Sequence, residues 1–309
     1  GLPKAMVHSH GGIVLTHLKT NRLQHDVLPG DRFMFLGSTG WIVWNLMIGS
    51  LLAGATVVLS DGNPTAPSDD ALWDFIDQYQ VSIFGCGAAF LTKSMKDGVS
   101  PKKGRQFEKL RAISSTGSPL PLDAYAWVYD NVKNDLWLAS ISGGTDIASG
   151  FVACAPILPV NAGEIQCREL GVAAHAFNEQ GQKVIAEVGE LVITEPMPSM
   201  PVFFWNDESG ARYHDSYFDV FAGCWRHGDW IEFSERGTAV IYGRSDSTIN
   251  RFGIRMGTAE IYRVVEELEA VKDSLVVDLE YLGRPSFMPL FVTLAEGQAL
   301  TGELTAQIK

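Results

Sequence analysis

Short apolar runs alternate with segments of helical periodicity over the first half of the chain. Four runs rich in β-branched residues predict buried strands, at Ala55–Leu59, Val81–Phe84, Leu110–Ser114 and Leu136–Ile141. Helical patterns lie between them, at about Asp69–Tyr79, Ala88–Lys96 and Leu122–Val132. Strands that alternate with helices are typical of a parallel sheet with helices on its faces. The pattern therefore predicts an α/β domain.

The stretch Trp41–Leu59 carries no charge and is long enough to suggest a membrane span. Gly54 interrupts it, however, and the residues Thr56-Val57-Val58 favour a strand over a helix. We therefore expect a buried helix at about Trp41–Ala53 followed by a strand, and no membrane span.

The pattern changes after about Phe151. Short strands divided by turns are expected at Gly163–Arg168, Val172–Phe177, Val184–Ala186 and Glu190–Thr194, with a hairpin turn at Asn178–Gly181. They predict an antiparallel or barrel-like β subdomain. After Gly243, a helix from Thr258 to about Val271 with an apolar face is expected to precede strands at Leu275–Leu279 and Leu290–Leu294. This is the start of a small α+β domain.

Composition and charge narrow the function. The 309 residues suit a large domain with a smaller one, and the 46% of apolar residues are enough for a substantial core. The net charge is −12, so the chain lacks the basic footprint of a protein that binds nucleic acid. An anionic ligand must be held by a few local donors, which points to small-molecule substrates.

The four cysteines are widely spaced and form no metal-ligand pattern. Free thiols are typical of a reducing compartment, so we expect the cytosol. No signal peptide is visible, and because the chain begins with Gly1 instead of Met, we expect a fragment or a processed chain. The pair His8 and His10 lacks a third ligand and is expected to be structural.

Four short clusters combine glycine with residues that can bind a nucleotide. They are Ser115–Pro119, Ser142–Asp146, His227–Trp230 and the arginine-containing segment Gly243–Arg255. The first two follow predicted strands, where glycine lets a ligand approach the backbone closely. The Thr145 hydroxyl can bond a phosphate oxygen, and Asp146 can hold Mg²⁺. Each cluster also has an ordinary explanation, as a turn, a helix cap or a strand-to-helix loop.

The remaining candidates are charged. Asp229 follows a glycine turn and can accept both hydroxyls of a ribose, although a turn Asp more often bonds its own backbone. Arginines suit phosphate because of their planar donor fork, but a solvated basic loop is the alternative. Lys4 can lie beside a phosphate loop. The chain has no GxxxxGK[ST] and no GxSxG, which argues against a P-loop NTPase and an acyl hydrolase.

Taken in order, the segments resemble the motifs of the adenylate-forming superfamily, which includes acyl-CoA synthetases, peptide-synthetase adenylation domains and luciferases. The matching segments are Gly1–Ala5, the end of the phosphate loop; Gly189–Ile193; His227–Asp229; Gly243–Asp246; and Gly253–Arg255. The resemblance implies a large AMP-binding domain over residues 1–243 with a β-rich subdomain at about 151–243. It also implies a hinge at 244–246 and an incomplete C-terminal domain over 247–309.

Within that superfamily, Gly257–Ile261 is similar to the branch of acetyl-CoA and acetoacetyl-CoA synthetases. Gly37–Asn45 and Ser142–Asp146 look like the acetoacetyl-CoA group, since acetyl-CoA synthetases have a Trp where this chain has Gly143. The resemblance implies ATP-dependent ligation of acetoacetate to CoA through an acyl-adenylate, with Mg²⁺, releasing AMP and pyrophosphate. An acetyl- or propionyl-CoA synthetase is the alternative, and a non-catalytic nucleotide-binding remnant is the alternative of another class.

The resemblance assigns roles by position. Adenine would contact Gly117, Ser118 and Pro119; the AMP site would be lined by Ser142, Gly143, Gly144 and Thr145, with Thr145 at the α-phosphate. Asp229 would bind ribose, and Arg244 would assist it. Arg255 and Lys4 would lie at the phosphates. Asp146 stands where the family has a metal-binding Glu. Trp41, Thr116 and Gly143 would line the acyl pocket, and Asp246 would be the hinge. The rest of the phosphate loop and the family's C-terminal catalytic Lys are absent from this sequence.

Overall fold

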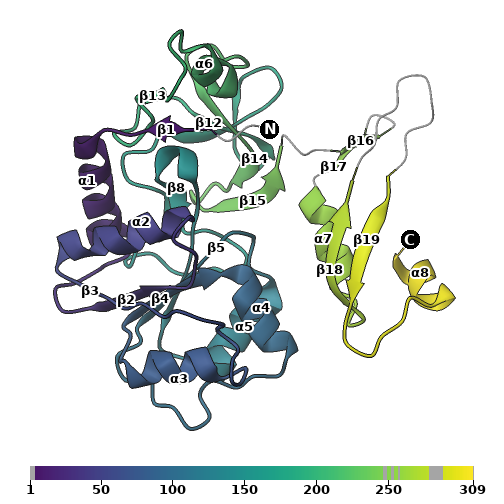
Figure 1. Cartoon of the computed structure of the whole chain (residues 1–309). Helices are drawn as coiled ribbons and strands as arrows, with labels where there is room; N and C mark the ends of the chain where they lie inside the picture. The colour runs from purple at the N-terminus through teal and green to yellow at the C-terminus, as the bar shows by residue number, and fades with distance from the viewer. Residues whose placement is uncertain (1–3, 246–248, 252–253, 257, 278–287, 309) are drawn as a thin grey trace. The chain divides into compact units, whose positions relative to one another are not determined.

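The chain divides into two compact units. The computed structural model describes residues 4–245, 249–251, 254–256, 258–277 and 288–308 (Figure 1). The first unit comprises residues 1–227 and 232–241, and the second comprises residues 228–231 and 242–309.

A five-stranded sheet forms the centre of the first unit. Its strands are, in spatial order, β3 (Thr56–Val57), β2 (Arg32–Phe35), β4 (Ile83–Gly87), β5 (Ala112–Thr116) and β6 (Trp137–Ser140). Every neighbouring pair is parallel. The connecting helices are α2 (Ile42–Gly49), α3 (Ala71–Gln78), α4 (Ala88–Lys96) and α5 (Leu122–Asn131). The predicted parallel α/β arrangement is confirmed, but β2 was missed, because it contains none of the β-branched residues by which the other strands were recognised.

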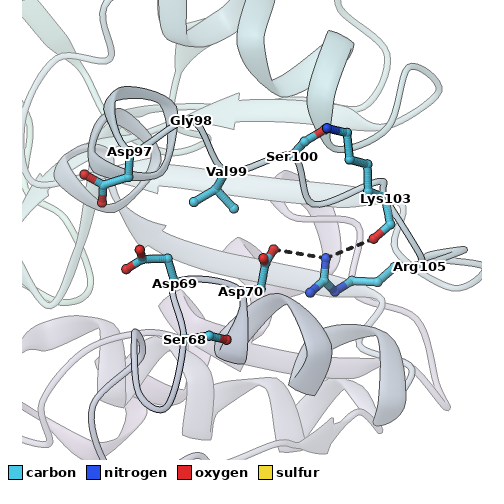
Figure 2. A pocket seen from close by; sticks show the side chains of 9 residues that line it. All are labelled: Ser68, Asp69, Asp70, Asp97, Gly98, Val99, Ser100, Lys103 and Arg105. Atoms are coloured by element: carbon cyan, nitrogen blue, oxygen red, sulfur yellow. Dashed lines mark hydrogen bonds and ion pairs between the residues drawn. The ribbon is translucent and has the colours of Figure 1, made fainter.

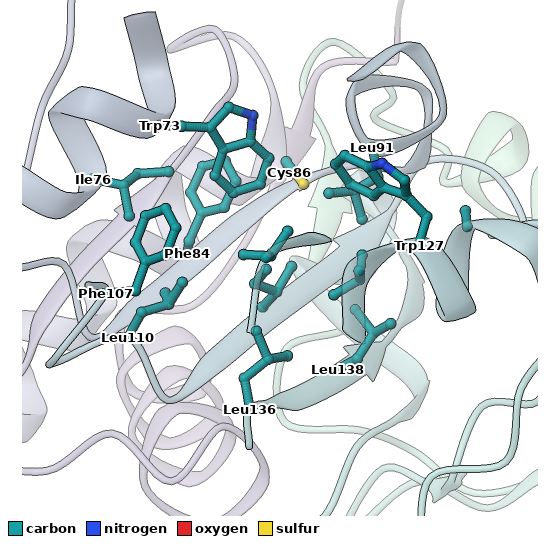
Figure 3. Packing of buried hydrophobic residues seen from close by; sticks show 14 of the residues in the cluster. Trp73, Ile76, Phe84, Cys86, Leu91, Phe107, Leu110, Trp127, Leu136 and Leu138 are labelled. Atoms are coloured by element: carbon teal, nitrogen blue, oxygen red, sulfur yellow. The ribbon is translucent and has the colours of Figure 1, made fainter. Parts of the chain in front are cut away.

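Helices cover both faces of this sheet (Figure 1), and the side chains that alternate along its strands build two cores. On one face, Phe84 and Leu138 pack with Trp73 of α3 and Trp127 of α5 (Figure 3). On the other face, Phe33, Phe35, Ile83 and Ala112 pack with Val43 and Met47 of α2. Burial on both faces explains why these strands read as continuous apolar runs in the sequence.

The uncharged stretch folds as expected. The helix α2 continues into a 3-10 turn, η2 (Ser50–Ala53), which ends at Gly54 in the left-handed conformation before β3 begins. Within the described residues, no helix is long and apolar enough to cross a membrane.

The second half of the first unit is built from small antiparallel sheets. One contains β7 (Ser142–Gly144), β8 (Ser149–Ala153) and β9 (Cys167–Arg168), and another pairs β1 (Met6–Val7) with β13 (Phe203–Phe204). A third has the order β11 (Lys183–Val184), β10 (Ala174–Phe177), β12 (Gly189–Ile193), β14 (Trp225–Phe233) and β15 (Ala239–Arg244). A short helix, α6 (Ala211–Tyr217), precedes β14. The predicted hairpin turn is confirmed, since the Asn178 side chain accepts bonds from the N–H groups of Gln180 and Gln182.

The second unit contains the expected α+β elements. They are β16 (Ile249–Arg251), β17 (Ile254–Met256), α7 (Thr258–Glu266), β18 (Val271–Val276), β19 (Leu290–Leu294) and α8 (Gly302–Ile308). The helix predicted to run to about Val271 was too long, because the chain leaves α7 after Glu266 and Val271 starts β18, which pairs antiparallel with β19. Val264 is exposed and Val265 is buried, so the predicted apolar face is narrower than expected.

The helix α1 (His10–Lys19) and the π-helical turn η1 (Thr20–Gln24) that continues it were not predicted. Their hydrophobic pattern is reversed. The buried residues are polar or glycine: Gly12, Thr16, His17, Thr20, Asn21 and Gln24. The large apolar residues are exposed: Val14, Leu15, Leu18 and Leu23. A search for an apolar inward face therefore does not find this helix.

Adjacent glycines at the start of α1 should respond oppositely to alanine. A Cβ at Gly11 would meet nothing within 4 Å, whereas one at Gly12 would overlap the carbonyl oxygen of Pro198. We expect Gly11→Ala to stabilise the protein by about 0.5–1 kcal/mol through helix propensity, and Gly12→Ala to destabilise it by about 1–3 kcal/mol. Urea denaturation followed by tryptophan fluorescence measures both, and equal shifts would contradict the packing of α1 against Pro198.

The buried His25 should make stability depend on pH. Its side chain follows η1, lies 3.3 Å from the Ser114 hydroxyl and is almost fully buried. Burial lowers the pKa of His25 to about 4. Because the unfolded chain takes up this proton at about pH 6.5, the stability from neutral His25 is complete above that pH and is lost towards pH 4.

The expected loss is about 3 kcal/mol over this range. Unfolding free energies at pH 7 and pH 4.5 should differ less in His25→Gln than in the wild type. The exposed His10→Gln is the control. If His25→Gln showed the same pH dependence as the control, this assignment would be wrong.

Candidate functional site

The predicted site residues of the first unit gather at one edge of the parallel sheet. The predicted adenine loop, 117–119, follows the last residue of β5, and Ser142 lies two residues beyond the end of β6. These strands are neighbours and run parallel, so both loops leave the sheet at its carboxyl edge. The β2–α2 connection, which contains Trp41, starts at the same edge, next to the point where the strand order reverses between β2 and β4. Open α/β sheets bind ligands at such a point.

The three residues of the predicted acyl pocket differ in their contacts. The Trp41 indole lies 3.5 Å from where a Cβ on Gly117 would stand, and Gly117 has a φ of +86°, which favours glycine. The Thr116 hydroxyl donates a hydrogen bond of 3.0 Å to the carbonyl oxygen of Ile141. This bond ties the ends of β5 and β6 together. Trp41 and Thr116 therefore both adjoin Gly117, the first residue of the adenine loop.

Gly143 and Gly144 are needed by the packing of the β7–β8 hairpin. Gly143 faces Gly150 across the hairpin, and a Cβ on Gly143 would overlap the Ser149 carbonyl oxygen. A Cβ on Gly144 would lie 2.8 Å from Cε1 of His227. The structure thus gives Gly143 a steric role that the sequence did not indicate, and its role in the acyl pocket stays a prediction. Thr145 begins the 3-10 turn η3 (Thr145–Ile147) and is exposed.

Lys4 and Asp146, distant in sequence, lie next to each other. Nζ of Lys4 is 3.6 Å from Oδ1 of Asp146 and 4.6 Å from the ring centre of Tyr217. The Tyr217 hydroxyl donates a hydrogen bond to the same carboxylate oxygen. Burial alone would raise the pKa of Asp146, but the Tyr217 hydroxyl, His227 and Lys4 outweigh it and hold this pKa below its ordinary value. Asp146 is therefore ionised at neutral pH.

An ionised carboxylate at this position fits Mg²⁺ as one of its oxygen ligands. Among the described residues, no group of three or more His, Cys, Asp or Glu side chains could hold a metal ion. Mg²⁺ commonly uses one or two carboxylates together with phosphate oxygens and water. Asp146 therefore suits a metal ion shared with a phosphate ligand and does not suit a site made of protein ligands alone.

Two neighbours of these residues had no predicted role. Tyr217 ends α6 and stacks on Trp225, with ring centres 3.5 Å apart and planes 12° apart. His227 packs on Phe151, with ring centres 4.3 Å apart. His227 lies in a segment that the sequence singled out for Asp229 alone, whereas nothing in the local sequence around Tyr217 marks it, because its contacts come from residues remote in the chain.

The remaining candidates belong to the second unit. Asp229 is buried in β14, and Nη1 of Arg244 lies 3.4 Å from its Oδ1. The Ser245 N–H donates a 2.8 Å hydrogen bond to the carbonyl oxygen of Gly228. Arg255 lies in β17, and its backbone is paired with that of Asn250 in β16. The predicted hinge residue Asp246 lies outside the described residues.

A separate polar pocket contains none of the predicted site residues (Figure 2). It lies at the start of α3 and beyond the end of α4, and its lining residues include Asp69, Asp70, Asp97, Lys103 and Arg105. Arg105 lies 3.1 Å from Asp70 and 2.8 Å from Asp74. The Arg105 guanidinium is therefore paired with Asp70 within the pocket and with Asp74 beside it.

Comparison with known proteins places this geometry in a family. A family model described as "AMP-binding enzyme" matches residues 1–200. The chain is 43% identical over its full length to the acetoacetyl-coenzyme A synthetase of Rhizobium meliloti (strain 1021) and 42% identical to the acetoacetyl-CoA synthetase of Gallus gallus. It covers 47% and 46% of these proteins, so it spans about half the length of the curated relatives it matches.

Two solved structures share the fold of this chain. The acetoacetyl-CoA synthetase from Streptomyces lividans superposes with a TM-score of 0.92 at 48% identity, over 100% of this chain and 47% of that one. The anthranilate CoA ligase AuaEII, in complex with anthranoyl-AMP, gives a TM-score of 0.80 at 18% identity over 100% of this chain and 58% of that one, and shows the shared adenylate-forming fold alone. The family model matches residues 1–200, which is more than half of this chain of 309 residues, so the chain belongs to the AMP-binding enzyme family.

Proposed function

We propose that this chain is part of an ATP-dependent ligase that joins acetoacetate to CoA through an acetoacetyl-adenylate. One observation carries the proposal: the similarity to proteins named acetoacetyl-CoA synthetase extends over all 309 residues at 43% identity. The gathering of the predicted adenine and phosphate loops at one edge of the parallel sheet supports it.

In the first step, an oxygen of the acetoacetate carboxylate forms a bond to the α-phosphorus of ATP. The bond between that phosphorus and the bridging oxygen breaks, and pyrophosphate leaves. Gly117, Ser118 and Pro119 would receive adenine, Ser142, Gly143 and Gly144 would line the AMP site, and Thr145 would donate to the α-phosphate. Lys4 and Arg255 would offset the negative charge that builds on the phosphates. Bound Mg²⁺, held by Asp146, would supply further charge neutralisation.

Asp229 would accept the ribose hydroxyls. Its carboxylate is held near the guanidinium of Arg244 at 3.4 Å, so the acceptor keeps a fixed direction. Positioning of the reactants is the main contribution of such contacts.

In the second step, the CoA sulfur attacks the acyl carbon of the adenylate. The carbon–oxygen bond to AMP breaks, the thiol proton is lost, and AMP leaves. We propose that the C-terminal domain turns about Asp246 between the steps, as expected from the family resemblance. The four cysteines are unpaired, which suits a reducing compartment such as the cytosol.

The choice of acetoacetate over acetate or propionate depends on a small difference in acyl length. A pocket discriminates between acids that differ by a methylene by about 1–3 kcal/mol. Trp41 and Thr116 would form the walls, because they flank Gly117 at the sheet edge. Acetyl- and propionyl-CoA synthesis are therefore expected as weaker side activities.

The proposal is tested with the full-length protein. CoA-dependent release of AMP should be fastest with acetoacetate in a panel that includes acetate and propionate. Arg255→Ala should reduce ATP–pyrophosphate exchange about a hundredfold or more, because a charge facing the phosphates in the transition state is removed. Faster turnover of acetate than of acetoacetate would overturn the substrate assignment, and normal exchange in the variant would overturn the role of Arg255.

Gly143 allows a second test, of backbone packing. Gly143→Ala should destabilise the protein by about 1–3 kcal/mol and weaken ATP binding with every acid, because the new Cβ would overlap the Ser149 carbonyl oxygen. Gly87→Ala is the control, since its nearest atom would be 3.8 Å away. A change in acid preference without loss of stability would instead support the pocket role of Gly143.

A further inference from the structure

The buried polar side chains of α1 and η1 bond chiefly to one part of the fold, the strand β8 and its surroundings. Most of the polar side chains on their buried face bond to residues at the ends of β8 and to the turn that follows β9. Burying polar groups is unfavourable unless each finds a partner. The apolar side chains of the same helix remain exposed, so burial of apolar surface does not explain its orientation.

Two of these side chains hold the two ends of β8. Nε2 of His17 lies 3.0 Å from the carbonyl oxygen of Ala148, the residue before β8. Nε2 of Gln24 donates a 2.7 Å hydrogen bond to the carbonyl oxygen of Cys154, the residue after β8. The spacing of seven residues corresponds to about two helical turns, which puts both side chains on one face.

The buried carboxylate of Glu169 links η1 to the start of β8. Oε1 of Glu169 accepts hydrogen bonds from Lys19 at 2.6 Å, from the Ser149 hydroxyl at 3.0 Å and from the Thr20 hydroxyl. Its side chain is fully buried, and a Cβ on Gly150 would overlap its other oxygen. We name His17, Thr20, Gln24 and Glu169 the β8 clamp.

Ala148 is the point where the clamp meets the predicted nucleotide loop. It has a φ of +49° and a ψ of +33°, a left-handed conformation that alanine rarely adopts. Its N–H donates to the carbonyl oxygen of Thr145, so Ala148 closes the turn that presents Thr145 and Asp146. Unfavourable backbone conformations persist where neighbouring groups hold them, and they cluster at functional sites.

The environment of His17 is suited to this bond. Burial lowers the pKa of His17, so the ring is neutral, and it must carry its proton on Nε2 to donate to a carbonyl oxygen. Gly49 of α2 makes room for the His17 side chain, since a Cβ there would lie 2.8 Å from both Cβ and Nδ1 of His17.

We propose that His17 is a positioning residue that fixes the Thr145–Ser149 turn for ATP binding. This inference rests on the proposed function, because it assigns the turn to the phosphates of ATP. His17 itself does not touch the substrate. It acts by holding the Ala148 carbonyl, so its loss should affect the turn more than the rest of the fold.

The chain offers a matched control. Asn21 lies on the same helical face, is fully buried, and donates to the carbonyl oxygens of His17 and Leu46, not to β8. Asn21→Leu therefore removes buried hydrogen bonds of the same helix without releasing the turn. His17→Leu removes the donor, and His17→Gln keeps an amide N–H that can reach the same carbonyl.

The experiment uses the full-length protein with two readouts. Amide hydrogen exchange over residues 145–149 reports the turn directly, and ATP–pyrophosphate exchange reports KM for ATP. His17→Leu should speed hydrogen exchange of the turn and raise KM about tenfold, the effect of one buried hydrogen bond. His17→Gln should restore both readouts to within about threefold of the wild type, and Asn21→Leu should lower stability while leaving both near wild type.

The outcomes separate the two proposals. If the wild type shows no pyrophosphate exchange but His17→Leu still loosens the turn, the proposed function fails and the positioning of the turn stands. If the wild type is active and His17→Leu leaves both readouts unchanged, or if Asn21→Leu changes them equally, the positioning role of His17 is overturned.

Discussion

The parallel pairing of β2, β4, β5 and β6 is the constraint on which the candidate site depends. Parallel strands end at the same edge of a sheet, so loops that follow different strands are brought together whatever their distance in sequence. The two cores fix this arrangement, because side chains alternate between the faces and a shift by one residue would move apolar side chains to the wrong core. Trp41, Gly117 and Ser142 share an edge for this reason.

The hairpin of β7 and β8 depends on a different kind of interaction. The turn between these strands carries Thr145 and Asp146, and hydrogen bonds link β8 and its flanking residues to side chains of α1, of η1 and of Glu169. Hydrogen bonds have direction, whereas apolar contacts do not, so a polar support can fix the orientation of single carbonyl groups. Burying the Glu169 carboxylate is unfavourable, and the interactions of its Oε1 with Lys19 and two hydroxyl groups offset this.

In each of the two units, one positive side chain among the predicted site residues lies beside one carboxylate. In an acidic chain with a net charge of −12, Lys4 and Arg244 each lie beside a specific carboxylate, Asp146 and Asp229 respectively. Each pair restricts the orientations that its two side chains can take.

The sequence by itself determined the parallel α/β arrangement, the change to antiparallel strands after Phe151 and the loops that carry the candidate residues, because these depend on local periodicity and on glycine-rich turns. It did not indicate α1, whose inward face is polar, or β2, which contains no β-branched residue. Only the tertiary structure decided that Tyr217 bonds Asp146, that Gly143 must lack a side chain opposite Ser149, and that His17 holds Ala148. The contacts of Tyr217 with Asp146 and of His17 with Ala148 join residues remote in the chain, and no local pattern encodes which of them will meet.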